Sequence, residues 1–149
     1  MSYEAVENAL LTTIQTSTAN FTARNTSQGD YRILANGATH YVVLQMGSFE
    51  NLRINIRGDQ RRSWNINMEL WVPFQGELST VANVIRDQRH NLIDTVSQYT
   101  HLGAGNAVFD AFVTSADEPV IQTIPGGPTC WKQVVICRVQ EDTALTLVD

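Results

Sequence analysis

Apolar residues recur with a helical period in two stretches of the chain. The first predicts a helix over about Tyr3 to Thr16 with Ser2 as its N-cap, and the second predicts a helix over Glu77 to Tyr99 that ends in a left-handed C-cap at Gly103. The apolar stripe of the first helix is Tyr3, Val6, Leu10 and Ile14. The stripe of the second is Leu78, Val81, Ile85, Leu92, Val96 and Tyr99. Each helix therefore offers one face to a core.

Alternation of apolar and polar residues predicts strands between the helices. Thr39 to Met46 is apolar, β-branched and bounded by glycines, which indicates a strand buried on both faces. Leu52 to Ile56 and Trp64 to Val72 alternate strictly around a break at Gly58 to Gln60. These two segments predict a hairpin with one apolar face and one largely polar face.

The remaining segments complete the order of elements. Asn20 to Gly37 is rich in polar residues and glycine, and we expect a loop with one short strand at Tyr31 to Leu34. Two strands are expected at Ala107 to Ser115 and Trp131 to Glu141, joined by the turn-rich segment Asp117 to Thr129.

The order is one helix, three strands, a long helix and two strands. It predicts an α+β fold, an antiparallel or mixed sheet of about five strands with both helices packed on one face. No linker or repeat divides the sequence, so residues 1–149 are expected to form one domain. Residues 142–149 follow the last expected strand, as a mobile tail or a segment that pairs with a neighbouring subunit.

Composition narrows the classes of protein. The 149 residues are 43% hydrophobic and carry 15 acidic and 10 basic side chains, for a net charge of -5. No segment has the length of apolar sequence that spans a bilayer, and the first residues do not form a signal peptide, so we expect no membrane association. Cys130 and Cys137 fall on opposite faces of one expected strand, so both are expected to be reduced thiols. Cys130, beside a glycine-rich turn, is expected to be the more exposed.

A basic cluster interrupts this acidic chain at the expected hairpin. Its residues are Arg53, Arg57, Asp59, Arg61 and Arg62. Charged residues at a loop tip are usually only solvated. The alternative is an interface with another protein subunit, because the guanidinium group suits protein interfaces better than the lysine ammonium group. A basic tip would complement the acidic body of an identical neighbour, which permits head-to-tail closure into a ring.

Signals for catalysis are weak. Asp87, His90 and Asp94 share one face of the long helix and could hold a divalent cation in a small metal-dependent enzyme, although the same face is where a solvated polar surface belongs. Cys137 alternates with apolar residues and is expected to be inert packing. We expect no catalysis, no cofactor and no resident metal. His40 and His101 are given no role.

With these segments placed, the sequence resembles the tail-terminator and tail-completion (head–tail joining) proteins of long-tailed bacteriophages. The segments that carry the resemblance are Tyr41 to Gln45 followed by Gly47 to Glu50, Arg62 to Val72, the long helix, Val108 to Ser115 with Asp117 to Pro119, and Trp131 to Val139. The resemblance covers the chain from the first helix to the last strand. It rests on the order of elements and on diffuse patterns.

The resemblance implies a structural subunit of the virion tail neck, made in the cytoplasm of the bacterial host. Such subunits form a hexameric ring that caps the tail tube, contacts the tail tube protein and joins the head–tail connector, while DNA passes through the lumen without specific binding. An acidic body suits such a channel because fixed negative charge repels phosphate. A connector stopper or adaptor protein, at a nearby position in the same particle, is the alternative.

Overall fold

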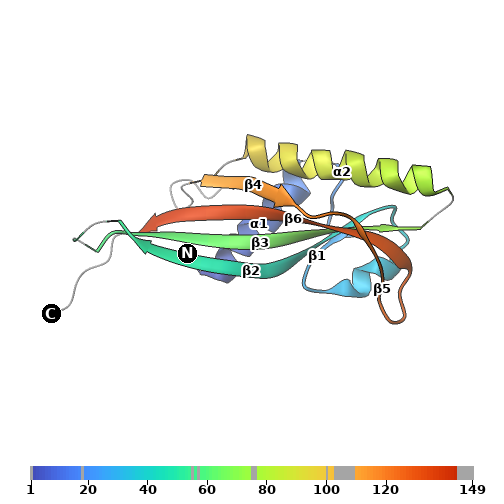
Figure 1. The fold of residues 1–149 in the computed structure, drawn as a ribbon, viewed down its shortest axis with the longest axis horizontal. Helices are drawn as coiled ribbons and strands as arrows, with labels where there is room; N and C mark the ends of the chain where they lie inside the picture. The colour runs from blue at the N-terminus through green and yellow to red at the C-terminus, as the bar shows by residue number, and fades with distance from the viewer. Residues whose placement is uncertain are drawn as a thin grey trace.

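The protein folds as a six-stranded mixed sheet with two helices (Figure 1). The computed structural model describes residues 2–17, 19–54, 56, 58–74, 77–99, 101–102 and 110–143. In chain order the elements are α1 (Tyr3–Ser17), β1 (Thr26–Gln28), the 3-10 helix η1 (Tyr31–Ala35), β2 (Tyr41–Arg53), β3 (Gln60–Pro73), α2 (Leu78–Gln98), β4 (Asp110–Ala116), β5 (Val120–Thr123) and β6 (Thr129–Thr143). The predicted α+β class is confirmed, with one strand more than expected.

Strand β3 is the centre of the sheet. It pairs antiparallel with β2 on one side and with β6 on the other over nearly its whole length. The short β1 lies parallel to the start of β2, where Thr26 is opposite Val42. Strands β4 and β5 both pair with the outer side of β6, at different points along it. The sheet order is therefore β1-β2-β3-β6-β4, with β5 beside β6.

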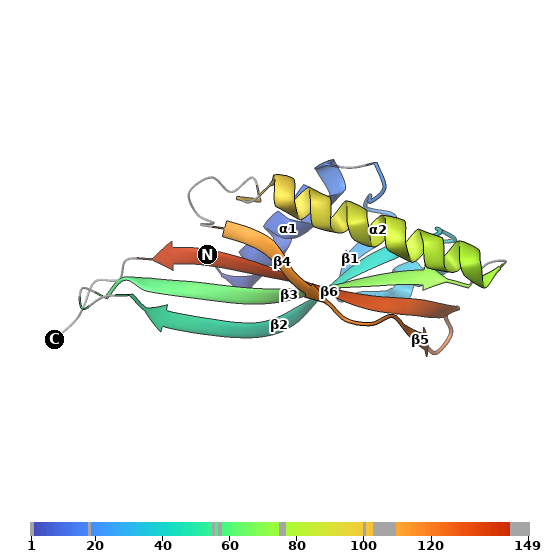
Figure 2. The ribbon, with the colours of Figure 1, turned by 45° about the horizontal axis from the view of Figure 1, so that its top comes forward.

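Both helices cover the same face of the sheet, as predicted (Figures 1 and 2). Their buried stripes pack on alternate residues of the strands in one apolar cluster. The helical members are Val6, Leu10 and Ile14 of α1 and Val81, Ile85, Leu92 and Val96 of α2. The main strand members are Val42, Leu44, Trp64, Ile66, Met68, Leu70, Val135, Cys137 and Val139. Leu78 and Tyr99, predicted at the ends of the α2 stripe, are instead exposed.

A second, smaller cluster lies on the opposite face, under η1. It consists of Leu34, Tyr41, Val43, Trp71 and Cys130. The prediction that the start of β2 is buried on both faces is thus confirmed for residues 41–44. Cys130 is fully buried, which corrects the expectation that it is the more exposed cysteine. Both cysteines are free, and burial raises the pKa of Cys130 to about 11 and that of Cys137 to about 12.

The segment before β2 differs from the expected loop. Tyr31 to Leu34, predicted as a strand, belongs to η1 because Asp30 caps this turn, its carboxylate accepting a hydrogen bond from the backbone N–H of Arg32 at 2.9 Å. Residues 26–28 form a strand that was not predicted. Hydrogen bonds from Arg32 hold the pKa of Asp30 near 2. A short capped turn thus overrides the apolar character of the segment.

The strand predicted at Thr39 to Met46 continues to Arg53 as the single strand β2, which includes only Leu52 and Arg53 of the strand predicted at Leu52 to Ile56. Ile54 and Ile56 lie outside any strand, which corrects that prediction. The register against β3 shifts between Met46 and Phe49. Gly47 makes this possible, since a Cβ at this position would overlap the backbone carbonyl of Asn65. Gly47 was predicted to end a strand, but it lies within β2 where β2 approaches β3 closely.

The ends of the later elements also shift. The segment predicted as turns, Asp117 to Thr129, contains β5. Strand β6 runs on to Thr143, so the first two residues of the predicted tail are paired, and residues 144–149 lie outside the described part. The start of the strand predicted from Ala107 and the predicted C-cap Gly103 also lie outside it. The left-handed residue after α2 is Leu102, with φ at 50°.

Candidate interaction surface

Three strands continue past the part of the sheet that the helices cover and form an arm (Figure 2). We define the arm as Phe49–Arg53 of β2, Gln60–Ser63 of β3 and Gln140–Thr143 of β6. The cross-strand register holds them together, with Leu52 opposite Arg61 and Arg61 opposite Asp142. The alternating sequence on both sides of the turn makes the strands long. Arg53, Arg61 and Arg62 of the basic cluster predicted from the sequence lie on this arm.

Apolar side chains on the β2 side of the sheet, from the base of the arm to its tip, are exposed. Their exposed fractions are 70% for Met46, 53% for Phe49, 64% for Leu52, 46% for Ile54 and 90% for Ile56. The sequence predicted a hairpin in which Leu52, Ile54 and Ile56 form one apolar face, and these side chains are exposed. No described helix or strand lies over them, so alternation alone does not indicate burial.

Phe49 and Leu52 lie on different faces of the arm. The Phe49 ring packs on Trp64, with centroids 5.7 Å apart, and Trp64 belongs to the cluster beneath the helices. Leu52 is opposite Arg61, which is three residues from Trp64 along β3. Because successive side chains of a strand point to opposite faces, Leu52 lies on the face opposite Phe49. The exposed apolar surface therefore surrounds the outer edge of β2 on both sides.

Two of the four predicted arginines pair with the end of β6. Arg61 donates from Nε and an Nη atom to the two carboxylate oxygens of Asp142, at 2.8 and 3.0 Å. Arg62 lies 3.9 Å from Glu141. The hydrogen bonds from Arg61 lower the pKa of Asp142, and Asp142 raises the pKa of Arg61. The sequence missed these pairs because it placed Asp142 beyond the last strand.

The rest of the cluster is divided between the end of β2 and the turn. Arg53, exposed at the last position of β2, is opposite Gln60. The backbone carbonyl of Asp59 accepts a hydrogen bond from the N–H of Ile54 at 2.8 Å, which closes the turn. Arg57 lies outside the described residues. Their assignment to a subunit or tube interface stays a prediction.

The opposite edge of the sheet carries acidic and apolar groups. In the segment from β4 to β5, Asp110, Asp117 and Glu118 are acidic and no residue is basic. Phe112, Val120 and Ile121 expose 37%, 53% and 66% of their surface. Sequence reasoning missed this edge because two prolines flank the short β5 and the segment reads as turns. The β-branched pair Val120 and Ile121 was the available signal.

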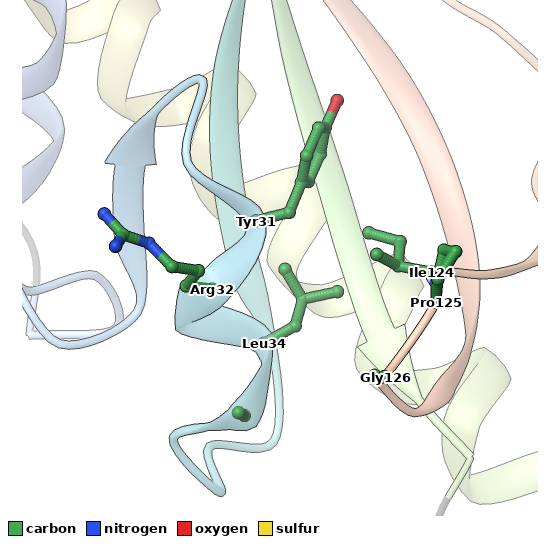
Figure 3. Close-up of a pocket in the computed structure, with 8 residues that line it drawn as sticks. Tyr31, Arg32, Leu34, Ile124, Pro125 and Gly126 are labelled. Carbon is green, nitrogen blue, oxygen red and sulfur yellow. The ribbon is translucent and has the colours of Figure 1, made fainter.

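A cavity of about 290 Å³ lies between η1 and the turn that joins β5 to β6 (Figure 3). Leu34 and Ile124 face each other across it, while Arg32 points away and pairs with Asp30 at 2.8 Å. The Tyr31 hydroxyl donates to Glu69 Oε1 at 2.7 Å and accepts from Gln45 Nε2 at 2.8 Å. The polar groups nearest the cavity are thus committed to contacts within the protein.

Glu69 is the centre of this buried polar network. Trp71 Nε1 donates to its Oε1 at 3.3 Å, and Lys132 Nζ lies 3.4 Å from its Oε2. The same ammonium group lies 5.2 Å from the centroid of the Trp71 ring. Together with the Tyr31 hydroxyl, these contacts fix η1 to the face of the sheet opposite the helices. The network is a structural support.

The metal candidate on α2 is an exposed contact between a histidine and an aspartate side chain. His90 Nε2 lies 3.0 Å from Asp94 Oδ2, and both side chains are more than half exposed. No group of three or more His, Cys, Asp or Glu side chains positioned to hold a metal ion occurs among the described residues. Across the same residues, no helix has the length and apolar character to cross a membrane.

Comparison with known proteins gives no relative: no protein-family model matches the chain, and no curated sequence matches it.

Proposed function

We propose that this chain is a structural subunit of a bacteriophage tail neck, forming a ring that caps the tail tube and joins it to the head connector. The resemblance of the sequence to tail-terminator and tail-completion proteins supports the proposal. The structural observation that carries it is the arm, with exposed apolar side chains around a sheet edge. Exposed apolar surface of this kind is typical of proteins that bury it on assembly.

The charge of the chain fits that role. On the arm, the three basic residues Arg53, Arg61 and Arg62 balance the three acidic residues Glu50, Glu141 and Asp142, so the net charge of -5 lies elsewhere in the chain. A ring of acidic subunits lets DNA slide through its lumen, because like charges keep phosphate from adhering. The partners in this proposal are copies of the chain, the tail tube protein and the connector, and the role is not catalytic.

The first test is negative-stain electron microscopy of the purified protein at high concentration. Closed rings with a central hole and six-fold class averages would support the proposal. Labelling the protein in assembled particles then gives its position. Density at the head-proximal end of the tube supports the terminator role, density on the portal side indicates a stopper or adaptor, and a label absent from the neck rejects both.

The arginine cluster has its own test, Arg61→Glu combined with Arg62→Glu. We expect a folded monomer that assembles poorly. Because both arginines pair within the chain, the control adds Glu141→Arg and Asp142→Arg, which restores the cross-strand pairs with exchanged charges. If a neighbouring molecule contacts the arginines, the fourfold variant stays defective. If it assembles normally, the arginines serve only to hold the arm together.

A further inference from the structure

One side of β2 is open along the arm. Strand β1 pairs with β2 only at residues 42–44, and among the described residues no strand pairs with the outer side of β2 from Met46 to Arg53. The outward backbone N–H and C=O groups of this stretch therefore have no described strand to pair with, and the side chains of Met46, Phe49 and Leu52 beside them are exposed. We call residues 46–53 the β2 edge. A long apolar edge of this type readily adds another strand.

The other side of the sheet is open as well. Strands β4 and β5 pair with β6, and no other described strand pairs with them. We call residues 110–123 the β4–β5 edge. Its strand β4 has seven residues, close to the length of the β2 edge, and it exposes Phe112, Val120 and Ile121. One molecule therefore has two free apolar edges of similar length on opposite sides of one sheet.

Strand direction makes these two edges compatible. Three antiparallel pairings, β2 with β3, β3 with β6 and β6 with β4, lead from one edge to the other. An odd number of reversals leaves β4 antiparallel to β2. A second copy beside the first, with its sheet in the same orientation, thus offers β4 antiparallel to the β2 edge, which is the slightly more stable type of pairing.

Charge favours the same partner. The β4–β5 edge carries Asp110, Asp117 and Glu118 without a basic residue, and no described cation pairs with these three carboxylates. Arg53, at the end of the β2 edge, is exposed and makes no ion pair with a described acidic group. When β4 lies antiparallel beside the β2 edge, Asp110 is at the end nearer Arg53, so a register that brings these two residues together places a cation of one copy beside a carboxylate of the next.

We propose that the β2 edge of one molecule pairs with the β4–β5 edge of a second copy of this chain, so that neighbouring sheets become continuous around the assembly. The contact is head to tail, and it uses a different surface on each side, which is the arrangement that closes into a ring. It deepens the proposed function and rests on it for the closed ring, because the edges alone do not fix the number of copies.

The test uses two single variants at exposed positions, Leu52→Glu on the β2 edge and Phe112→Glu in β4 on the β4–β5 edge. Each places a charge on an apolar edge and keeps the opposite edge intact. Leu78→Glu is the matched control, since Leu78 is an exposed leucine on α2 away from both edges. Circular dichroism checks that each variant is folded, and sedimentation velocity over a range of concentrations measures its mass.

We expect wild type and Leu78→Glu to form species larger than a dimer, and each edge variant to associate at least about tenfold more weakly. Mixing the two edge variants leaves one native interface, from the β2 edge of Phe112→Glu to the β4–β5 edge of Leu52→Glu. The mixture should therefore give a heterodimer and nothing larger. A wild type that stays monomeric, a mixture that stays monomeric, or a loss of association in Leu78→Glu would each overturn the pairing.

Hydrogen exchange adds a readout across the interface. Amide protons of residues 49–53 should exchange more slowly in the wild-type assembly, and Phe112→Glu should remove that protection, although Phe112 is on the other edge of the sheet. Unchanged protection would overturn the proposal. The pairing and the proposed function can fail separately. If rings persist in both edge variants, only the pairing is rejected. If the mixed variants form heterodimers but the protein is absent from the phage neck, only the phage role is rejected.

Discussion

Strand β2 passes through two environments, and the contrast shows what determines burial in this protein. Its first four residues, Tyr41 to Leu44, are buried between the helices on one face and η1 on the other. Its last residues, including Leu52, are exposed on the arm. The first half is a continuous apolar run, whereas the second carries Met46, Phe49 and Leu52 among polar residues, and both halves pair with β3. No described element packs over these three apolar residues, so the pattern identifies the strand while the packing elements determine which apolar side chains are buried.

The largest expected effect is a difference in the free energy of unfolding between truncations in the helix-covered part and on the arm. Ile85→Ala removes a buried side chain from the cluster between α2 and the sheet, and we expect it to lower the free energy of unfolding by about 2 to 5 kcal/mol. Leu52→Ala is the matched control, since it truncates an exposed side chain and should change stability by less than about 0.5 kcal/mol. Urea denaturation of the monomer measures both. Equal losses would mean that the arm is packed in solution.

The same contrast explains what the sequence could predict. Periodicity placed α1 and α2 within a residue or two, because each helix carries its own apolar stripe. It could not show that Leu52 is uncovered, since no local signal reports which element lies above a strand. It missed the pairing of Arg61 with Asp142 because that contact depends on how far β6 extends. Two single residues account for further differences from the prediction. Asp30 caps a 3-10 helix where a strand was predicted, and Gly47 allows a close approach of two strands where a strand end was predicted.

The next effect concerns the Glu69 network, which holds η1 to the face of the sheet opposite the helices. The arm has no described element held to it in this way. Glu69→Ala removes the acceptor for Tyr31 and Trp71 and leaves the largely buried Lys132 ammonium without its carboxylate. We expect a loss of about 3 kcal/mol in the free energy of unfolding. Glu69→Gln keeps a carbonyl acceptor and should cost clearly less. Equal losses in the two variants would show that the hydrogen bonds to Tyr31 and Trp71 contribute little.

A smaller effect is expected where the covered part joins the arm. Gly47→Ala forces a methyl group against the backbone carbonyl of Asn65, so β2 and β3 must separate locally. We expect a cost of about 1 to 3 kcal/mol, with faster amide exchange beyond the irregularity. The control, Ser48→Ala, removes only the hydroxyl that accepts from Asn65 Nδ2 at 2.6 Å and should cost under about 1 kcal/mol. A neutral Gly47→Ala would mean that the strands can widen at no cost.

The smallest effect distinguishes the two regions by their response to pH. In the covered part, burial lowers the pKa of His40 below its usual 6.5, against the opposing effect of its hydrogen bond to the carbonyl of Asn20 at 2.7 Å. The unfolded chain therefore binds the proton more readily, and the contribution of the neutral ring is complete above pH 6.5 and is lost as the pH falls below it. On the arm, Arg61 lowers the pKa of Asp142 below its usual 3.8, so the stabilising contribution of this carboxylate is lost only as the pH falls below 3.8.

The urea midpoint of the wild type should thus decline modestly between pH 7.5 and pH 5, and His40→Gln should flatten that decline. Asp142→Asn should leave the slope in this range unchanged, because the carboxylate stays ionised there. A wild-type slope that persists in His40→Gln would assign the titration to another group. A slope that disappears in Asp142→Asn would show that the arm, rather than the covered part of the sheet, responds to mild acid.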